Sequence, residues 1–162
     1  MSATMGANLD FIFGRRSIRV YAPGEIDDAT VTRLLEAAMA APSAMTKDPW
    51  RFMVVRQPAM LAQLAAALPG GKMLSTATLA IVACGDLDVA LDRQLSFLLQ
   101  DCSAAIQNLL LAAHALGLGA CWVGVHPSEA AVQKVKELMG LPGEQPEART
   151  RYNREYVHGE KW

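Results

Sequence analysis

The densest group of side chains that could bind a ligand lies near the N-terminus, where Arg15, Arg16, Ser17 and Arg19 fall within five residues. Guanidinium groups bind phosphate through paired hydrogen bonds, and a serine hydroxyl adds a further donor. As bare composition, adjacent arginines are more often a solvated surface than a binding site. The segment is therefore a candidate phosphate site, with a solvated face as the alternative.

Other chemical motifs are absent or incomplete. The pair Gly117 and Gly119 lies between a predicted helix and a predicted strand, the reverse of the order in a dinucleotide-binding fingerprint. The run Gly70-Gly71-Lys72 lacks the spacing of a phosphate-binding P-loop. The histidines show no metal-ligand spacing, and no serine or cysteine lies in a nucleophile elbow. A phosphate site without its own nucleophile, metal or triad suggests a bound cofactor that carries the chemistry.

Composition limits the classes of partner. The 162 residues are 52% hydrophobic and 19% charged with a formal net charge of -1, which gives no electrostatic reason to expect nucleic acid or a membrane surface as partner. Three cysteines in apolar surroundings indicate reduced thiols in a cytoplasmic protein. The N-terminus lacks the pattern of a signal peptide, and the longest apolar run, 109–125, is interrupted by His114 and three glycines. That run predicts a core helix followed by a strand, not a membrane span.

The elements that must position these residues are expected to form a single domain over residues 1–162. Apolar periodicity predicts helices at 8–13, from Asp27 or Asp28 to Pro42, at 58–68, and from Pro127-Ser128 to Gly140. Strands are expected at residues 50–55, 79–84 and 120–125 from their apolar, β-branched and aromatic content.

The central helix, which precedes Gly117, is apolar around almost its whole circumference. Its polar residues recur every two turns and form one narrow stripe, made of Gln100, Asp101, Gln107, Asn108 and His114. A chain of this length can hardly cover such a helix alone, so a second copy of the protein is expected against it. The tail at 143–162 is polar but ends in apolar residues, which predicts an arm that reaches a partner subunit, with a frayed terminus as the alternative.

Four motifs occur in order along nearly the whole chain: DFIFGRRSIRVY, APSAMTKDPWRFMVV, QNLLLAAHALGLGACWVGV and RYNREYVHGEKW. Together they resemble the FMN-dependent nitroreductase family. The resemblance implies an intertwined α+β homodimer with an antiparallel sheet flanked by helices and one FMN in each of two interface sites. It also implies an enzyme that passes hydride from NADH or NADPH through flavin N5 to a small-molecule acceptor, namely a nitroaromatic, a quinone or a flavin.

The same resemblance implies roles for individual residues, with the flavin and no side chain as the catalytic group. Arg15, Arg16 and Ser17 would hold the phosphate and ribityl chain, and Arg19 would face the N1–C2=O edge of the ring. Pro42, Ser43 and Thr46 would line the ring from the other subunit. Val123 and Gly124 would present a backbone N–H to N5, and Arg151 would return to the phosphate.

Two departures from the family pattern keep alternatives open. Thr46 and Asp48 stand where the family has asparagine and glutamine, and the chain runs from Pro142 directly into Gly143 where the family has a further apolar strand. One alternative is a flavin-binding or structural dimer without efficient turnover. The other is a specialised member that dehalogenates or fragments a flavin, although such members carry a lid for which this chain is too compact.

Overall fold

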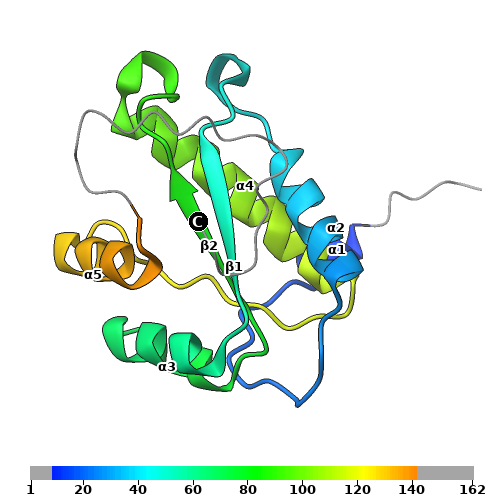
Figure 1. Cartoon of the computed structure of the whole chain (residues 1–162). Helices are drawn as coiled ribbons and strands as arrows, with labels where there is room; N and C mark the ends of the chain where they lie inside the picture. Colours follow the sequence, from blue (N-terminus) through cyan, green and yellow to red (C-terminus); the bar gives the residue numbers. More distant parts are fainter. Residues whose placement is uncertain (1–8, 142–162) are drawn as a thin grey trace, which may run out of the picture.

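The computed structural model describes residues 9–141 and contains a two-stranded sheet between two pairs of helices (Figure 1). The strands are β1 (Trp50–Val55) and β2 (Ala80–Gly85). The helices are α1 (Asp10–Phe13), α2 (Asp28–Met39), α3 (Pro58–Ala67), α4 (Leu95–Ala115) and α5 (Glu129–Met139). Short 3-10 turns lie at η1 (Ala44–Thr46), η2 (Lys72–Thr76) and η3 (Leu91–Arg93).

The strands pair antiparallel, with Trp50 opposite Gly85 and Val55 opposite Ala80. Side chains alternate between the two faces, as the pleat of a strand requires. Trp50, Phe52 and Val54 pack with α2 and α4, whereas Met53 and Val55 pack with α3 and α5. The figure shows the same division, with α2 and α4 on one side of the strands and α3 and α5 on the other. The predicted α+β class is confirmed by this arrangement.

Local sequence signals set the ends of several helices. Asp27 caps α2 by accepting a hydrogen bond from the Thr30 backbone N–H at 2.7 Å, and Ser128 caps α5 by accepting one from Ala131. At the far end of α4 the chain turns through Gly117 at φ +74°, where the Leu118 N–H donates to the Ala113 carbonyl. Glycine adopts this left-handed backbone without a steric cost, so the predicted helix break is confirmed.

The central helix α4 begins at Leu95, several residues before the stretch in which the sequence showed it clearly. Within this chain it contacts α1, α2, η3 and both strands, yet its buried residues are only Leu98, Asp101, Ala105, Leu110 and Ala113. By length and composition α4 could cross a membrane, a criterion that the core helices of many soluble proteins also meet. Much of its apolar surface is therefore open in the single chain.

The prediction of a third strand at residues 120–125 is wrong for this structure. Among residues 9–141 this segment forms no ladder, and its one bridge there joins Ala120 to Ser17 in parallel. Val123 and Val125 nevertheless pack against the cluster formed by β1, α3 and α5. This packing explains why the two side chains are apolar. A strand also needs a neighbouring backbone to pair with, which side-chain packing does not supply, so apolar content alone was misleading here.

Candidate functional site

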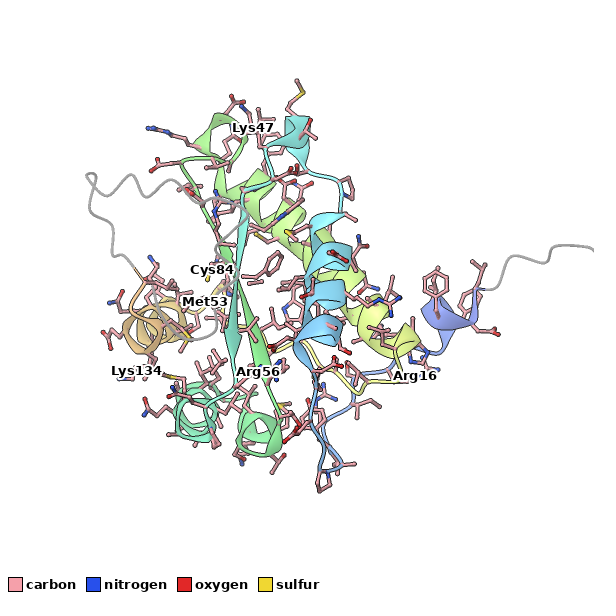
Figure 2. All side chains as sticks on the ribbon, turned by 45° about the vertical axis from the view of Figure 1, so that its right-hand side comes forward. Arg16, Lys47, Met53, Arg56, Cys84 and Lys134 are labelled. Carbon is pink, nitrogen blue, oxygen red and sulfur yellow. The ribbon has the colours of Figure 1, made fainter. Side chains whose placement is uncertain are left out.

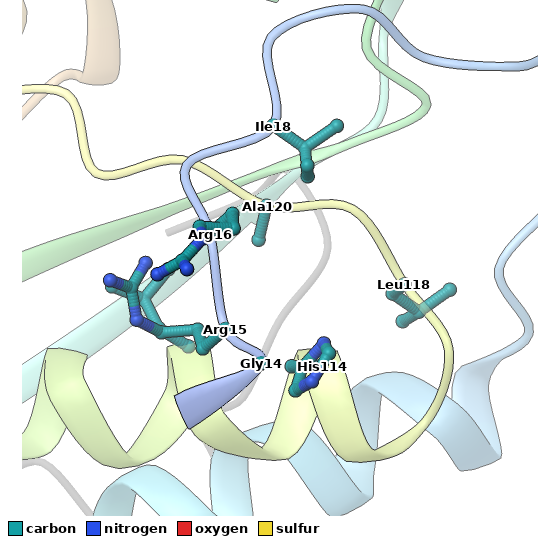
Figure 3. Close-up of a pocket in the computed structure, with 8 residues that line it drawn as sticks. Gly14, Arg15, Arg16, Ile18, His114, Leu118 and Ala120 are labelled. Carbon is teal, nitrogen blue, oxygen red and sulfur yellow. The ribbon is translucent and has the colours of Figure 1, made fainter. Parts of the chain in front are cut away.

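The arginine segment, residues 15–19, leaves α1 at Gly14 and passes the last turn of α4. Arg15, Arg16 and Ile18 line a pocket of about 130 Å³ together with His114, Leu118 and Ala120 (Figure 3). The guanidinium groups of Arg15 and Arg16 point to the same side of the segment in this view. Two guanidinium groups and an imidazole belong to residues that line this one pocket, and such groups are donors suited to a phosphate.

Gly14 sets how closely this segment approaches α4. A Cβ atom at Gly14 would lie 2.6 Å from His114 Nε2 and 2.8 Å from the carbonyl oxygen of Asp10. Because real Cβ atoms do not approach other atoms so closely, only glycine fits here without a shift of the chain. The glycine therefore lets the arginine segment lie directly against His114.

Ser17 and Ile18 lie against the segment that follows α4 in the sequence. The Ile18 N–H donates to the Ala120 carbonyl at 2.9 Å, within the bridge that pairs Ser17 with Ala120. A Cβ atom at Gly119 would come within 2.9 Å of the Ile18 side chain. The structure thus brings the predicted phosphate residues to the start of the 120–125 segment, which carries Val123 and Gly124.

Arg19 is exposed beyond this contact and lies near Tyr21. Burial and the neighbouring Cys121 raise the pKa of Tyr21, whereas the positive charge of Arg19 lowers it. These effects place Arg19, Tyr21 and Cys121 in one neighbourhood. Arg19 does not line the pocket beside His114; it shares its surroundings with Cys121, the second residue of the 120–125 segment.

The second group of predicted residues lies in the loop before β1. Ser43 Oγ donates to Asp48 Oδ1 at 2.6 Å and accepts from the Asp48 N–H at 3.0 Å, which closes residues 43–48 into a loop, called the 43–48 loop below. Met45, Thr46 and Asp48 have φ of 50°, 54° and 48°, a left-handed conformation unusual for residues with a side chain. Such conformations persist where the surrounding contacts hold them, and they concentrate at functional sites.

The structure does not bring the two groups together within one chain. Asp101 of α4 contacts the 43–48 loop, whereas His114 of the same helix lies beside Gly14. At 1.5 Å per residue these two positions on α4 are roughly 20 Å apart. Figure 2 shows Lys47 of the loop and Arg16 at well-separated places on the molecule. Within one chain the two groups are therefore two separate sites along α4.

The remaining predicted residues are less constrained. Val123 is half-buried, and Gly124 is exposed, with only the His126 carbonyl oxygen at 4.0 Å from a Cβ built there. Nothing within the described part of this chain requires glycine at 124, so its proposed close approach to a flavin stays a prediction. Pro42 and Thr46 are exposed and Ser43 is half-buried. Arg151 and the predicted arm at 143–162 lie outside the described residues.

Sequence reasoning named three residues that shape these groups, Asp101, His114 and Asp48, but did not predict their contacts. The first two belong to the polar stripe of α4, which the sequence showed as a stripe without partners. In the structure Asp101 accepts from the Ala44 N–H at 2.9 Å, and Asn108 donates to the Ala37 carbonyl at 3.1 Å. The stripe is therefore a row of contacts to other segments. The polar residues are confined to one narrow face of an otherwise apolar helix, and this pattern could have indicated that they contact other segments.

Comparison with known proteins gives a consistent result. The model of the nitroreductase family matches residues 12–70 and 66–149. A protein of Archaeoglobus fulgidus, named as a candidate NADH dehydrogenase/NAD(P)H nitroreductase, is 40% identical over 171 aligned positions that cover 95% of this chain and 98% of that protein. The aligned length exceeds the 162 residues of this chain, so the relative has positions with no counterpart here. A strand missing after Pro142 stays a prediction.

Solved structures agree. A candidate NADH dehydrogenase/NAD(P)H nitroreductase of Bacteroides thetaiotaomicron is 35% identical, with a TM-score of 0.78 and coverage of 98% of this chain and 100% of that one. An FMN-dependent nitroreductase of Clostridium difficile is 29% identical, with a TM-score of 0.76 and coverage of 95% and 99%. A candidate nitroreductase of Desulfovibrio desulfuricans in complex with FMN is 34% identical, with a TM-score of 0.72 and coverage of 85% and 76%. With a family model that spans most of its length and a relative 40% identical over nearly all of it, the chain belongs to the nitroreductase family.

Proposed function

We propose that the protein is an FMN-dependent oxidoreductase that uses NADH or NADPH to reduce a small acceptor, such as a nitroaromatic, a quinone or a free flavin. The observation that carries the proposal is the pocket between the arginine segment and the last turn of α4, which gathers Arg15, Arg16 and His114. The name of the Clostridium difficile relative and the FMN bound to the Desulfovibrio desulfuricans relative support the cofactor. The names of the relatives of Archaeoglobus fulgidus and Bacteroides thetaiotaomicron support NAD(P)H as the reductant.

In this proposal the chain binds and orients, and bound FMN supplies the electron transfer between NAD(P)H and the acceptor. Arg15 and Arg16 hold the phosphate, and Ser17, fixed by its bridge to Ala120, adds a hydroxyl donor toward the phosphate and ribityl chain. Arg19 lies past this bridge, where its positive charge favours extra negative charge on the pyrimidine end of the ring. Val123 and Gly124 continue from the same bridge as an extended backbone that offers N–H groups to the ring.

The active form in this proposal is a homodimer with shared sites. Pro42, Ser43 and Thr46 lie on the loop held by Asp101, about 20 Å along α4 from the arginine segment, so they line the flavin of the other subunit. Large apolar side chains are exposed around the arginine segment, among them Phe13 at 68%, Val20 at 88% and Trp122 at 45%. Burial of this surface and of the open side of α4 favours association with a second copy. The free thiols favour a reducing, cytoplasmic compartment.

A dimer that binds flavin without efficient turnover is the second candidate. The observation that favours it is the pairing of Ser43 with Asp48, because Asp48 stands where the family has glutamine and occupies the serine hydroxyl. Thr46 likewise offers one hydroxyl where the family has an amide.

Absorbance of the purified protein separates these functions. An FMN-dependent enzyme is yellow as purified or after addition of FMN, and under anaerobic conditions its flavin absorbance bleaches with NADH or NADPH and recovers with a quinone. A protein that binds FMN but does not bleach is the binding dimer. A protein that binds no FMN contradicts both.

A further inference from the structure

We propose that Asp101 is the positioning residue of the 43–48 loop, and that through this loop it sets the geometry of the flavin site in the partner subunit. The second half of this inference rests on the proposed function; the first half rests on contacts within this chain. Neither the family match nor the sequence patterns assign Asp101 a role.

Asp101 is an unusual residue for its position. In the described part of the chain it is the one charged side chain that is buried, with 5% exposure, and it stands on a helix that is otherwise largely apolar. Burial of a carboxylate is unfavourable unless hydrogen bonds compensate for the lost water. The unfavourable free energy of burying Asp101 must therefore be offset by a hydrogen bond that an apolar side chain at this position could not make.

That partner is the backbone of the 43–48 loop. Oδ1 of Asp101 accepts from the Ala44 N–H at 2.9 Å, a contact between residues 57 positions apart in the chain. Ala44 is the first residue of η1, directly before Met45 and Thr46 with their left-handed backbones. The bond therefore fixes the loop at the point where its unusual conformation begins. The hydrogen bonds between Ser43 and Asp48 hold its shape but do not attach it to the rest of the protein.

The second carboxylate oxygen of Asp101 allows two substitutions to be compared, one that keeps the hydrogen bond to Ala44 and one that removes it. Oδ2 is buried and has no hydrogen-bond partner in the described residues. An asparagine in place of Asp101 can keep the accepting oxygen toward Ala44, while its amide replaces the oxygen that has no partner. Asp101→Asn therefore keeps the tether, and Asp101→Ala removes it.

The same helix offers a matched control. Asn108 lies two turns further along α4 on the same stripe and donates to the Ala37 carbonyl of α2 at 3.1 Å. Asn108→Ala removes a polar tether of the same helix without touching the 43–48 loop. A purely structural role for Asp101 would make Asp101→Ala resemble Asn108→Ala.

The tether can also be removed from the loop side. Ala44→Pro deletes the donor N–H, and the backbone of Ser43, at φ −132° and ψ 156°, is extended as the residue before a proline requires. This variant leaves α4 unchanged and serves where Asp101→Ala does not yield folded protein.

A first readout does not depend on flavin. Lys47 is exposed within the loop, so trypsin cleavage after Lys47 reports whether the loop is held. We expect Asp101→Ala and Ala44→Pro to be cleaved there at least about tenfold faster than wild type, with Asp101→Asn and Asn108→Ala close to wild type. Equal cleavage of the Asp101→Ala and Asn108→Ala proteins overturns the positioning role, whether or not the protein binds FMN.

The second readout concerns the flavin site. In the FMN-loaded protein, Asp101→Ala should change the visible absorption of the bound flavin and lower kcat/KM for NADH with a benzoquinone acceptor by roughly 10–100-fold, as expected for a misplaced reaction site. Asp101→Asn should restore both and Asn108→Ala should alter neither. A faster-cleaved loop with unchanged flavin absorption and kcat/KM overturns the link to the site. If the wild-type protein binds no FMN, the proposed function is wrong and so is the link from Asp101 to the flavin site. The positioning of the 43–48 loop by Asp101 is then still tested by the cleavage experiment.

Discussion

At the scale of single residues, the arginine segment divides into a part that lines the pocket, where we propose that phosphate binds, and a part that lies beyond it. Arg15 and Arg16 line the pocket beside His114, whereas Arg19 follows the bridge between Ser17 and Ala120 and lies near Tyr21. Chemically identical side chains three or four positions apart are therefore expected to affect different properties of a bound flavin. Variants of Arg15 and of Arg19 can therefore serve as controls for each other.

Arg15→Ala should weaken FMN binding by roughly 1.5–3 kcal/mol, the scale of a hydrogen bond to a charged group. Because the phosphate does not change with the redox state of the ring, oxidised and reduced FMN should lose similar affinity. Fluorescence titration of the apoprotein with FMN measures the effect. Unchanged affinity in this variant would show that the pocket beside His114 is not the phosphate site.

Arg19→Ala should lower the midpoint potential of the bound flavin while leaving FMN bound. A cation at the pyrimidine end favours the ring more after reduction, when negative charge appears there. A fall of roughly 30 mV, about 1.4 kcal/mol for two electrons, is expected. Redox titration of this variant beside Arg15→Ala provides the comparison, and an unchanged potential with flavin still bound would place Arg19 on a solvated surface.

The thiols of Cys84 and Cys102 should be unreactive in the folded protein. Burial raises the pKa of both from 9.0 to about 11, with the charge of Asp101 adding to the effect at Cys102. At pH 8 the thiolate fraction is then roughly 100-fold below that of the unfolded chain, and alkylation by iodoacetamide should slow accordingly. Mass spectrometry of the labelled peptides, with urea-unfolded protein as control, measures the rates; equal rates in both states would contradict the burial.

The same shift gives a direction for stability. The folded pKa lies above the unfolded one, so the contribution of these thiols to the free energy of unfolding is fully present below about pH 9. It is lost as the pH rises from 9 towards 11, because only the unfolded chain ionises easily in that range.

At the scale of elements, α4 holds the two halves of the candidate site at a fixed separation. One of its ends touches the arginine segment through His114 and Gly14, and its earlier turns hold the 43–48 loop through Asp101. A helix is stiff over this length, so the two loops cannot approach each other without a change in α4 itself. The candidate site therefore depends on two contacts with α4: Gly14 against His114, and the 43–48 loop against Asp101.

Gly14→Ala should disturb the end of α4 that carries the phosphate pocket. The backbone at Gly14 has φ −78°, which any residue adopts, so the cost comes only from the methyl group near His114 Nε2 and the Asp10 carbonyl. The imidazole can move aside but the carbonyl belongs to α1, and strain of about 1–3 kcal/mol is expected. FMN affinity should fall roughly tenfold, as measured by fluorescence titration.

Gly24→Ala is the matched control, because a Cβ atom there meets nothing within 4 Å. The two variants make the same chemical change on either side of the arginine segment. Identical FMN affinity for both would show that the fit between Gly14 and His114 does not shape the pocket.

At the scale of the whole molecule, the open surfaces around α1 and α4 and the separation of the two loops both favour a second copy. The polar tail with its apolar end is expected to complete that assembly, as the sequence predicts. Its contacts lie outside the described residues, so solution behaviour must test it.

Deletion of residues 152–162 should shift the protein from dimer toward monomer or aggregate and release flavin at the same time, because in the proposed dimer each site takes residues from both copies. Light scattering combined with visible absorbance measures both properties in one run. Lys161→Ala, which keeps the apolar residues of the tail, is the control. A truncated protein that stays dimeric and yellow would refute the embracing arm.

The sequence by itself determined the elements whose signals are local. The caps at Ser128 and at Asp27, one of two candidates, the apolar period of α2 and α5, the aromatic and β-branched content of β1 and the glycine after α4 each act through neighbours a few residues away. The structure has an element boundary or an element of the predicted type at each of these places. The family motifs in the chain likewise carried its membership, because they are sequence patterns.

Only the tertiary structure decided what depends on partners far along the chain. Residues 120–125 have the composition of a strand, yet a ladder needs a second backbone at the right distance. In the part of the chain that the structure describes, their one bridge is to Ser17. Asp101 and Asn108 looked alike on one stripe, but the first meets Ala44 and the second meets Ala37, which lie in different segments. The spacing of residues along a helix shows which face they share; which loop crosses that face is set by the packing of the whole chain.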